Sequence, residues 1–221
     1  TAYMAFRACA LGYPTSVEAE VPVPLSRSEK NKKAYQTPDY NDQSYPTWSV
    51  IRYEFPARKL EVPGRDAVDL PPLKWTWYDG GNDKPAWVNK KLKELAQGEN
   101  VPDSGSLIIG DKGTLYSPSD YGAQFTMLPK ANFEGYAKPT PWIPRVHGKH
   151  QTEFIQAIKD NKPENCYSRF EVAGPLTETV VLGCVAMRAG KKIEWDGPNM
   201  KTNVPEANKF LRREYTEGYE L

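Results

Sequence analysis

The chain has 221 residues, with 29 basic and 28 acidic side chains and a formal net charge of +1. This near balance excludes a strong electrostatic attraction to nucleic acid or to an anionic membrane surface. The three cysteines are far apart and form no C-x-x-C pair, so we expect neither a disulfide framework nor a metal site.

The start of the chain is predicted to be helical. Apolar side chains recur there at helical spacing at Met4, Ala5, Ala8 and Leu11. Gly12 follows them and suits the left-handed conformation in which many helices end. No clear start signal precedes this helix, so we expect it to be the tail of a longer helix in a parent protein. A natural N-terminus left by processing is the alternative.

Alternation of apolar and polar residues predicts several strands. The segments that show it are 17–23, 48–55, 73–78 and the late pair Ile193 and Trp195. Segments 107–109 and 114–116 flank a Gly-Asp-Lys-Gly turn and predict a hairpin. Short turns between alternating strands favour a largely antiparallel sheet.

Helices are predicted mainly in the second half of the chain. The predicted segments are 87–96, 152–160, a core helix that begins at Gly174-Pro175 and ends before Gly190, and a last helix from about Pro205. The longest apolar run, 179–187, is much shorter than the roughly 20 residues of a membrane span, so no membrane partner is expected. Grouped strands and helices predict an α+β fold, an open-faced sheet with helices packed on one face.

His147 and His150 are the two histidines of the chain, and both lie just before a predicted helix. An H-x-x-H pair can supply metal ligands or an acid/base group. The structural alternative is that one histidine caps the helix and the other is solvated. No second set of ligand-type residues accompanies them, so no metal is assigned.

The segment Trp77-Tyr78-Asp79 lies where a predicted strand opens into a long loop. Aromatic rings stack on the C–H surfaces of sugars, and a neighbouring carboxylate accepts hydrogen bonds from hydroxyls, so these residues and Trp142 are candidates for carbohydrate binding. The alternative places Trp77 in the core, Tyr78 on the opposite face and Asp79 at the start of a turn.

Several separated segments resemble the Gfo/Idh/MocA oxidoreductases, a family named for glucose–fructose oxidoreductase, inositol dehydrogenase and a rhizopine-catabolism protein. The segments are LGYPTSVEA (11–19), LKWTWYDGG (73–81), IGDKGTLY (109–116), AGPLTE (173–178), AGKKIEWD (189–196) and RREY (212–215). The resemblance runs nearly end to end and is strongest to a bacterial branch with a distinctive C-terminal domain.

The resemblance implies that residues 1–221 are the substrate-binding and oligomerisation domain of a two-domain NAD(P)-dependent dehydrogenase. The chain has no G-x-G-x-x-G, so NAD or NADP is expected to bind mainly to a preceding Rossmann domain. The implied substrate is a sugar, polyol or glycoside. The catalytic lysine and histidine of the family are expected upstream of Thr1, so the isolated chain is expected to have no cofactor or activity of its own.

The resemblance also implies where substrate and subunits meet. Tyr3 is expected one helical turn after the missing histidine, facing the pocket. The full set of expected substrate-binding residues is Tyr3, Trp77, Tyr78, Asp79, Trp142, His147 and His150. The open sheet face of the family commonly forms a subunit interface, so a homo-oligomer is expected there, supported by exposed strand aromatics. The alternative function is a non-catalytic carbohydrate-binding or assembly domain, and the compartment, cytoplasm or periplasm, stays open.

Overall fold

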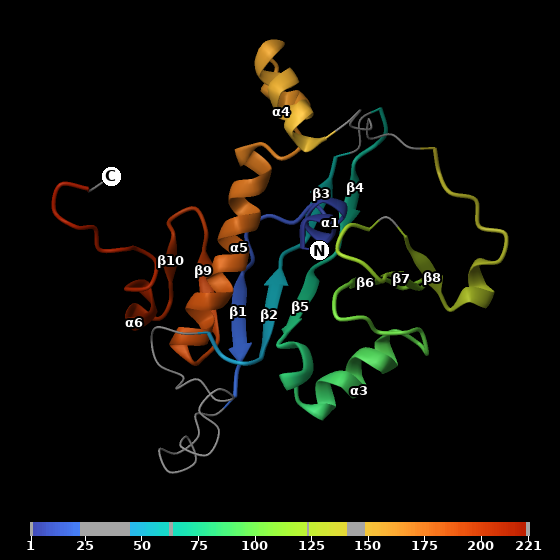
Figure 1. Cartoon of the computed structure of the whole chain (residues 1–221), viewed down its shortest axis with the longest axis horizontal. Helices are drawn as coiled ribbons and strands as arrows, with labels where there is room; N and C mark the ends of the chain where they lie inside the picture. Colours follow the sequence, from blue (N-terminus) through green and yellow to red (C-terminus); the bar gives the residue numbers. More distant parts are fainter. Residues whose placement is uncertain (1, 23–44, 62–63, 123, 141–148, 220–221) are drawn as a thin grey trace.

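The main element of the structure is an antiparallel sheet of five strands in the order β10-β9-β1-β2-β5 (Figure 1). The computed structural model describes residues 2–22, 45–61, 64–122, 124–140 and 149–219. The five strands are β1 (Ser16–Glu20), β2 (Ser49–Phe55), β5 (Leu73–Asp79), β9 (Ile193–Asp196) and β10 (Lys201–Thr202). The sequence predicted the first four of these, and β10 is an addition.

The register of β2 and β5 places four of their aromatic side chains, Tyr53, Phe55, Trp75 and Trp77, on one face of the sheet. Tyr53 pairs with Trp75, Ile51 pairs with Trp77, and the rings of Tyr53 and Trp75 stack with centroids 5.2 Å apart. This face belongs to the hydrophobic core. The strand tryptophans therefore do not supply exposed aromatics for the open face, which instead carries alternating polar residues such as Arg52.

Helix α5 (Phe170–Ala189) covers the apolar face of the sheet (Figure 1). Its residues Leu182, Val185 and Ala186 are buried in the core that also contains the apolar residues of β1, β2 and β9. Gly183 permits this close packing, because a Cβ atom there would lie 2.5 Å from the Tyr53 hydroxyl oxygen. Among the described residues, α5 alone is long and apolar enough to span a membrane, with a mean hydropathy of 1.4. Its buried inner face identifies it as a core helix.

Two helix ends differ from the sequence prediction. Helix α5 begins at Phe170, so Pro175 lies inside the helix instead of opening it. Its end is as predicted, because Gly190 adopts the left-handed conformation with φ 64°. Helix α1 (Ala2–Ala8) ends earlier than expected, and the left-handed residue that follows it is Ala10, with φ 48°, not Gly12. The backbone turns here because Leu11 N–H bonds the Phe6 carbonyl oxygen at 2.9 Å.

Two smaller antiparallel sheets flank the main one. Strands β3 (Arg58–Leu60) and β4 (Val68–Leu70) form a hairpin that the sequence did not predict. Strands β6 (Ser106–Ile109), β7 (Thr114–Ser117) and β8 (Thr126–Leu128) form a three-stranded sheet. The predicted hairpin is confirmed, with Gly110 N–H bonded to the Gly113 carbonyl oxygen at 2.9 Å.

The other helices lie around these sheets. They are α3 (Ala86–Leu95), α4 (His150–Lys159), α6 (Pro205–Asn208) and the short 3₁₀ turns η1 (Gly81–Asp83), η2 (Lys130–Phe133) and η3 (Pro163–Asn165). Helices α3, α4 and α6 lie where the sequence predicted helices. Helix α4 projects from the end of α5, away from the main sheet (Figure 1). The structure is thus an α+β fold with an open sheet, as predicted.

Candidate functional site

Tyr3 lies at the junction of α1, α4 and α5. Its hydroxyl donates a hydrogen bond to the main-chain carbonyl oxygen of Tyr167 at 2.9 Å, across 164 positions of sequence. Tyr167 lies between η3 and α5. Because the phenol proton is committed to this carbonyl, the lone pairs of the Tyr3 oxygen remain available to accept a hydrogen bond from a ligand hydroxyl.

The carboxylate of Glu153, on α4, binds the main chain of Tyr167 as well. The main-chain N–H of Tyr167 donates to Glu153 Oε1 at 2.9 Å. Both peptide groups that flank the Tyr167 side chain are therefore anchored, one to α4 and one to α1. We call Tyr3, Glu153, Tyr167 and Arg169 the junction site.

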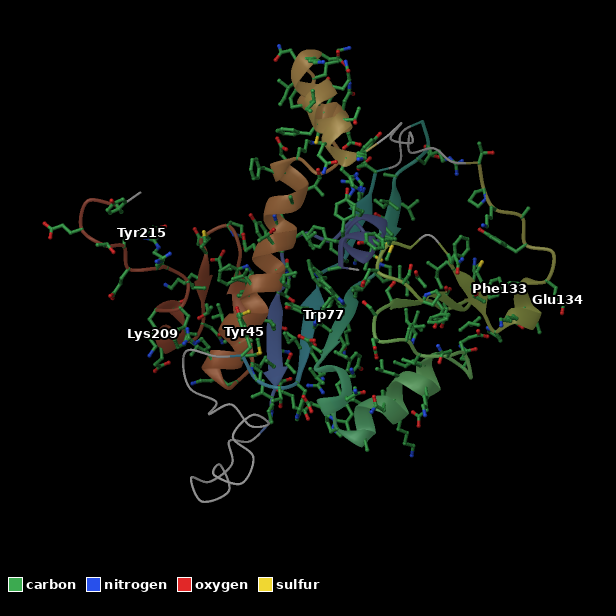
Figure 2. The ribbon with its side chains drawn as sticks, viewed as in Figure 1. Tyr45, Trp77, Phe133, Glu134, Lys209 and Tyr215 are labelled. Carbon is green, nitrogen blue, oxygen red and sulfur yellow. The ribbon has the colours of Figure 1, made fainter. Side chains whose placement is uncertain are left out.

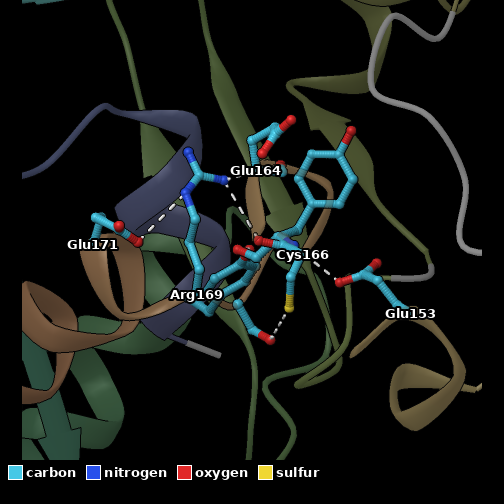
Figure 3. A network of polar contacts seen from close by, with 8 residues as sticks. Glu153, Glu164, Cys166, Arg169 and Glu171 are labelled. Carbon is cyan, nitrogen blue, oxygen red and sulfur yellow. Dashed lines mark hydrogen bonds and ion pairs between the residues drawn. The ribbon is translucent and has the colours of Figure 1, made fainter. Parts of the chain in front are cut away.

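Arg169, the residue directly before α5, completes the junction site (Figure 3). Its Nη1 donates to the carbonyl oxygens of Glu164 and Cys166, at 3.3 and 3.4 Å, and its Nε lies 3.5 Å from Glu171 Oε2. The guanidinium thus joins η3 to the start of α5. A charged donor shared between carbonyl groups and a carboxylate fixes the local backbone more firmly than neutral bonds do.

The predicted histidines are only partly described. His150 is exposed and opens α4 one turn before Glu153, so it lies close in sequence and on the same helix as a member of the junction site. His147 and Trp142 lie outside the described residues. Within the described part of the chain, no group of three or more His, Cys, Asp or Glu residues could hold a metal ion.

The structure does not gather Trp77, Tyr78 and Asp79 around one ligand position. Trp77 (labelled in Figure 2) contacts the edge of the Trp75 ring, with centroids 6.4 Å apart, and packs against the core. Tyr78 pairs with Val50 on the opposite face, where burial raises the pKa of its phenol. Asp79 accepts a hydrogen bond from Gly80 N–H at 2.8 Å, as in a turn. These placements agree with the alternative in which Trp77 packs in the core, Tyr78 lies on the opposite face and Asp79 begins a turn.

An open groove on the polar face of the main sheet was not predicted. It has a volume of about 610 Å³. Its lining residues are Thr15, Ser16, Glu54, Lys192, Glu194, Trp195, Asp196, Lys201, Thr202 and Asn203. Residues of four neighbouring strands, β10, β9, β1 and β2, line this groove. The sequence alone does not show that these strands are neighbours, because their order depends on the pairing of β9 with β1.

Glu54 organises one side of this groove. Its Oε2 accepts hydrogen bonds from Lys192 Nζ and Ser16 Oγ, both at 2.8 Å. The bond from Lys192 and then the bond from Ser16 lower the pKa of the Glu54 carboxyl. The hydrogen bond between Lys192 and Glu54 also raises the pKa of the Lys192 ammonium. A fixed carboxylate beside hydroxyl and ammonium groups provides the hydrogen-bonding partners that a polyhydroxylated ligand requires.

No family model and no curated protein matches the chain.

Proposed function

We propose that the chain is the C-terminal, substrate-side domain of an NAD(P)-dependent oxidoreductase of the Gfo/Idh/MocA type, acting on a sugar, polyol or glycoside. The observation that carries this proposal is the assembly of the resembling segments. Segments 11–19, 73–81 and 189–196 contribute strands β1, β5 and β9 to one sheet, and segment 173–178 lies in α5, which packs on that sheet. Segments that are far apart in sequence thus form one structural unit.

In this proposal Tyr3 is a substrate-binding residue. Its hydroxyl donates to Tyr167, so the Tyr3 oxygen would accept a hydrogen bond from a substrate hydroxyl. Glu153 and Arg169 would be positioning residues, because both hold the backbone beside the Tyr167 carbonyl group that accepts the hydrogen bond from Tyr3. Hydride transfer, the nicotinamide and the acid/base groups would belong to the preceding domain, which agrees with the lack of a dinucleotide-binding motif here.

The test begins with the genomic reading frame upstream of Thr1. A Rossmann fingerprint there, and nicotinamide binding by the longer protein but not by the 221-residue chain, is the expected result. Tight NAD(H) binding with sugar oxidation by the 221-residue chain alone would contradict the proposal. An upstream frame with no nucleotide-binding motif would also contradict it.

We also propose a homo-oligomer formed through the polar sheet face. Arg52 and Glu20 are paired there at 2.7 Å, so an interface on this face would be polar and salt-dependent. Sedimentation of the chain at low and high salt tests this proposal. A monomer under both conditions would contradict it.

A carbohydrate-binding module without chemistry is the second candidate function. The groove beside Glu54 favours it, because carboxylate, hydroxyl, amide and ammonium groups line one open volume. Calorimetry with a panel of sugars separates the candidates. A free-standing module binds a sugar unaided, and Glu54→Gln weakens that binding, whereas one half of an interdomain pocket binds weakly or not at all.

A further inference from the structure

The outer side of α5 carries a straight row of residues along its whole length. The inner side of this helix packs on the main sheet (Figure 1). At about 100° per residue, six positions on the opposite side lie within about 40° of one line along the helix axis. Five of the six are exposed and one, Cys184, is half-buried. We call them the α5 seam: Phe170, Gly174, Thr177, Val181, Cys184 and Arg188.

The α5 seam exposes large apolar side chains. Phe170 is 90% exposed and Val181 is 54% exposed, and Val180, beside the middle of the seam, is 46% exposed. Helix α5 as a whole has a mean hydropathy of 1.4. A helix that is apolar on its outer side as well as on its inner side is normally covered on both sides. The seam therefore has the composition of a contact surface.

The spacing of the seam is typical of a surface on which another helix packs. Its residues follow one another at alternate intervals of four and three, which is the repeat of helices that pack along each other in a coiled coil. The positions are also symmetric about residue 179, with the equidistant pairs 170 and 188, 174 and 184, and 177 and 181. A second α5 that runs in the opposite direction thus presents a seam position opposite every seam position of the first.

The charges at the two ends of α5 favour this antiparallel direction. Glu171, at the first turn, is 77% exposed and contacts Arg169 at 3.5 Å (Figure 3). Arg188, at the last turn, lies over the Phe210 ring at 4.9 Å and forms no ion pair with a described carboxylate. An antiparallel second copy brings Arg188 next to Glu171 at both ends, whereas a parallel copy would bring like charges together.

We propose that the α5 seam is a self-association surface, on which α5 of a second copy of this chain packs antiparallel. Phe170 of each copy would lie beside Arg188 and Phe210 of the other copy, where a cation and an aromatic ring attract each other. Between these ends the seam carries no charge. The inference does not depend on the proposed function, and the seam lies on the opposite side of the main sheet from its polar face.

The size of the seam sets the expected strength of the association. A helix of 20 residues is roughly 30 Å long and about 10 Å wide, so the contact covers about 300 Å² on each copy. A stable interface usually buries about 800 Å² on each partner. We therefore expect a dimer that dissociates on dilution.

Cysteine cross-linking tests the antiparallel arrangement, because Cys184 and position 174 of the other copy are predicted to face each other. Under mild oxidation, Gly174→Cys should form a disulfide between Cys184 and the introduced cysteine of a second copy. Its rate should be at least about tenfold higher than that of intermolecular disulfide formation in Ile109→Cys, whose position is 58% exposed on β6. Mass spectrometry of proteolytic fragments identifies the linked residues.

Two results of this experiment would overturn the proposal. One is a Gly174→Cys variant that forms no such disulfide, or forms the same amount of dimer after the further substitution Cys184→Ser. The other is a disulfide between the Cys184 residues of two unsubstituted chains, because only a parallel arrangement brings these residues together.

Sedimentation at increasing protein concentration tests whether the seam holds the dimer together. Val181→Lys should raise the dimer dissociation constant at least about tenfold, because it places two charges in the apolar contact. Val68→Lys is the matched control, since Val68 is 47% exposed on β4, outside the seam, and should leave the constant unchanged. Equal effects of the two substitutions would place the dimer contact elsewhere. A monomer at all concentrations would also overturn the proposal, and flotation of that monomer with phosphatidylcholine vesicles would identify lipid as the occupant.

Discussion

The hydroxyl of Tyr3 donates a 2.9 Å hydrogen bond to the carbonyl oxygen of Tyr167, and Glu153 accepts the N–H of that same residue. One residue between η3 and α5 therefore ties the first helix of the chain to α4. Neither partner alone fixes the junction, because loss of either bond leaves Tyr167 attached on one side only.

Removal of the Tyr3 hydroxyl should weaken the fold measurably. We expect Tyr3→Phe to lower the free energy of unfolding by about 1 kcal/mol, the typical net value of one hydrogen bond. Combined with Glu153→Ala, the loss should differ from the sum of the single losses by at least about 0.5 kcal/mol, since both act on Tyr167. Chemical denaturation measures both quantities. Tyr121→Phe is the control, because Tyr121 is 88% exposed and should show no change. Simple additivity of the two junction substitutions would argue against a shared anchor.

Isoleucine should contribute differently to stability inside the core and on the exposed side of α4. Ile193 has 0% exposure on β9, so Ile193→Ala should cost about 2–5 kcal/mol of unfolding free energy. Ile158→Ala in the 221-residue chain should change it by less than about 0.5 kcal/mol, because Ile158 is 63% exposed and little of its side chain is buried. Thermal and denaturant unfolding compare the two variants. Equal losses would mean that the chain buries Ile158 in solution.

Substitution by alanine should change stability in opposite directions at Gly174, inside α5, and at Gly190, directly after it. Gly174 lies inside the helix with no neighbouring atom within 4 Å of an added Cβ, so Gly174→Ala should stabilise the protein by about 0.5–1 kcal/mol. Gly190 has φ 64°, so Gly190→Ala should destabilise it by about 1–2 kcal/mol. The melting temperature should rise in Gly174→Ala and fall in Gly190→Ala. A helix beginning at Pro175 would instead place Gly174 outside it, and the first substitution would then bring no gain.

The ion pair between Glu54 and Lys192 should give a defined pH dependence. The pKa of Glu54 is lowered by the bonds from Lys192 and Ser16, so its contribution to stability is present above the ordinary carboxyl pKa and is lost as the pH falls through the folded-state value. The pKa of Lys192 is raised by its bond to Glu54, so its contribution is lost only as the pH rises through that raised value. Carbon-detected NMR titration of the Glu54 carboxyl should show the lowered pKa.

Lys192→Met is the matching variant for this pair. It should return the pKa of Glu54 toward its ordinary range, with the Ser16 bond and the charge of Lys74 left to lower it. Both side chains are partly exposed, so the effect on stability should be small and should decrease with salt. An unchanged titration of Glu54 in this variant would show that the pair does not form in solution.

The spacing of apolar residues in the sequence was sufficient to predict the elements that pack on the core. Strands β2 and β5 alternate because every second side chain enters the core, and that pattern is visible in sequence. The start of α5 was misjudged because Gly174-Pro175 has the composition of a helix opening, whereas the helix begins one turn earlier, after Arg169, and continues through Pro175. Hairpin β3–β4 was missed because Arg58, bonded to the carbonyl oxygens of Cys9 and Pro71, fixes strands too short to show a pattern.

The candidate site was harder to predict than the fold. Trp77 and Tyr78 attracted attention as aromatic residues beside a loop, but adjacent strand residues point to opposite faces, so the two rings do not lie side by side. Tyr3 was named from the family resemblance alone. Its partners Glu153 and Tyr167 carry no signal in sequence, because their bonds join segments whose proximity depends on how α1, α4 and α5 pack.

Gly183 sets the spacing between α5 and the sheet, since a single methyl group there would contact Tyr53 and Ile51 at less than 3 Å. A larger residue would tilt or lift the helix locally, and a helix of 20 residues is a rigid rod roughly 30 Å long. Such a tilt would displace the far end of the helix more than the part near Gly183. A displacement of a few tenths of an ångström at Gly183 would increase along the helix toward Phe170, so this interior position would set where the N-terminal end of α5 lies.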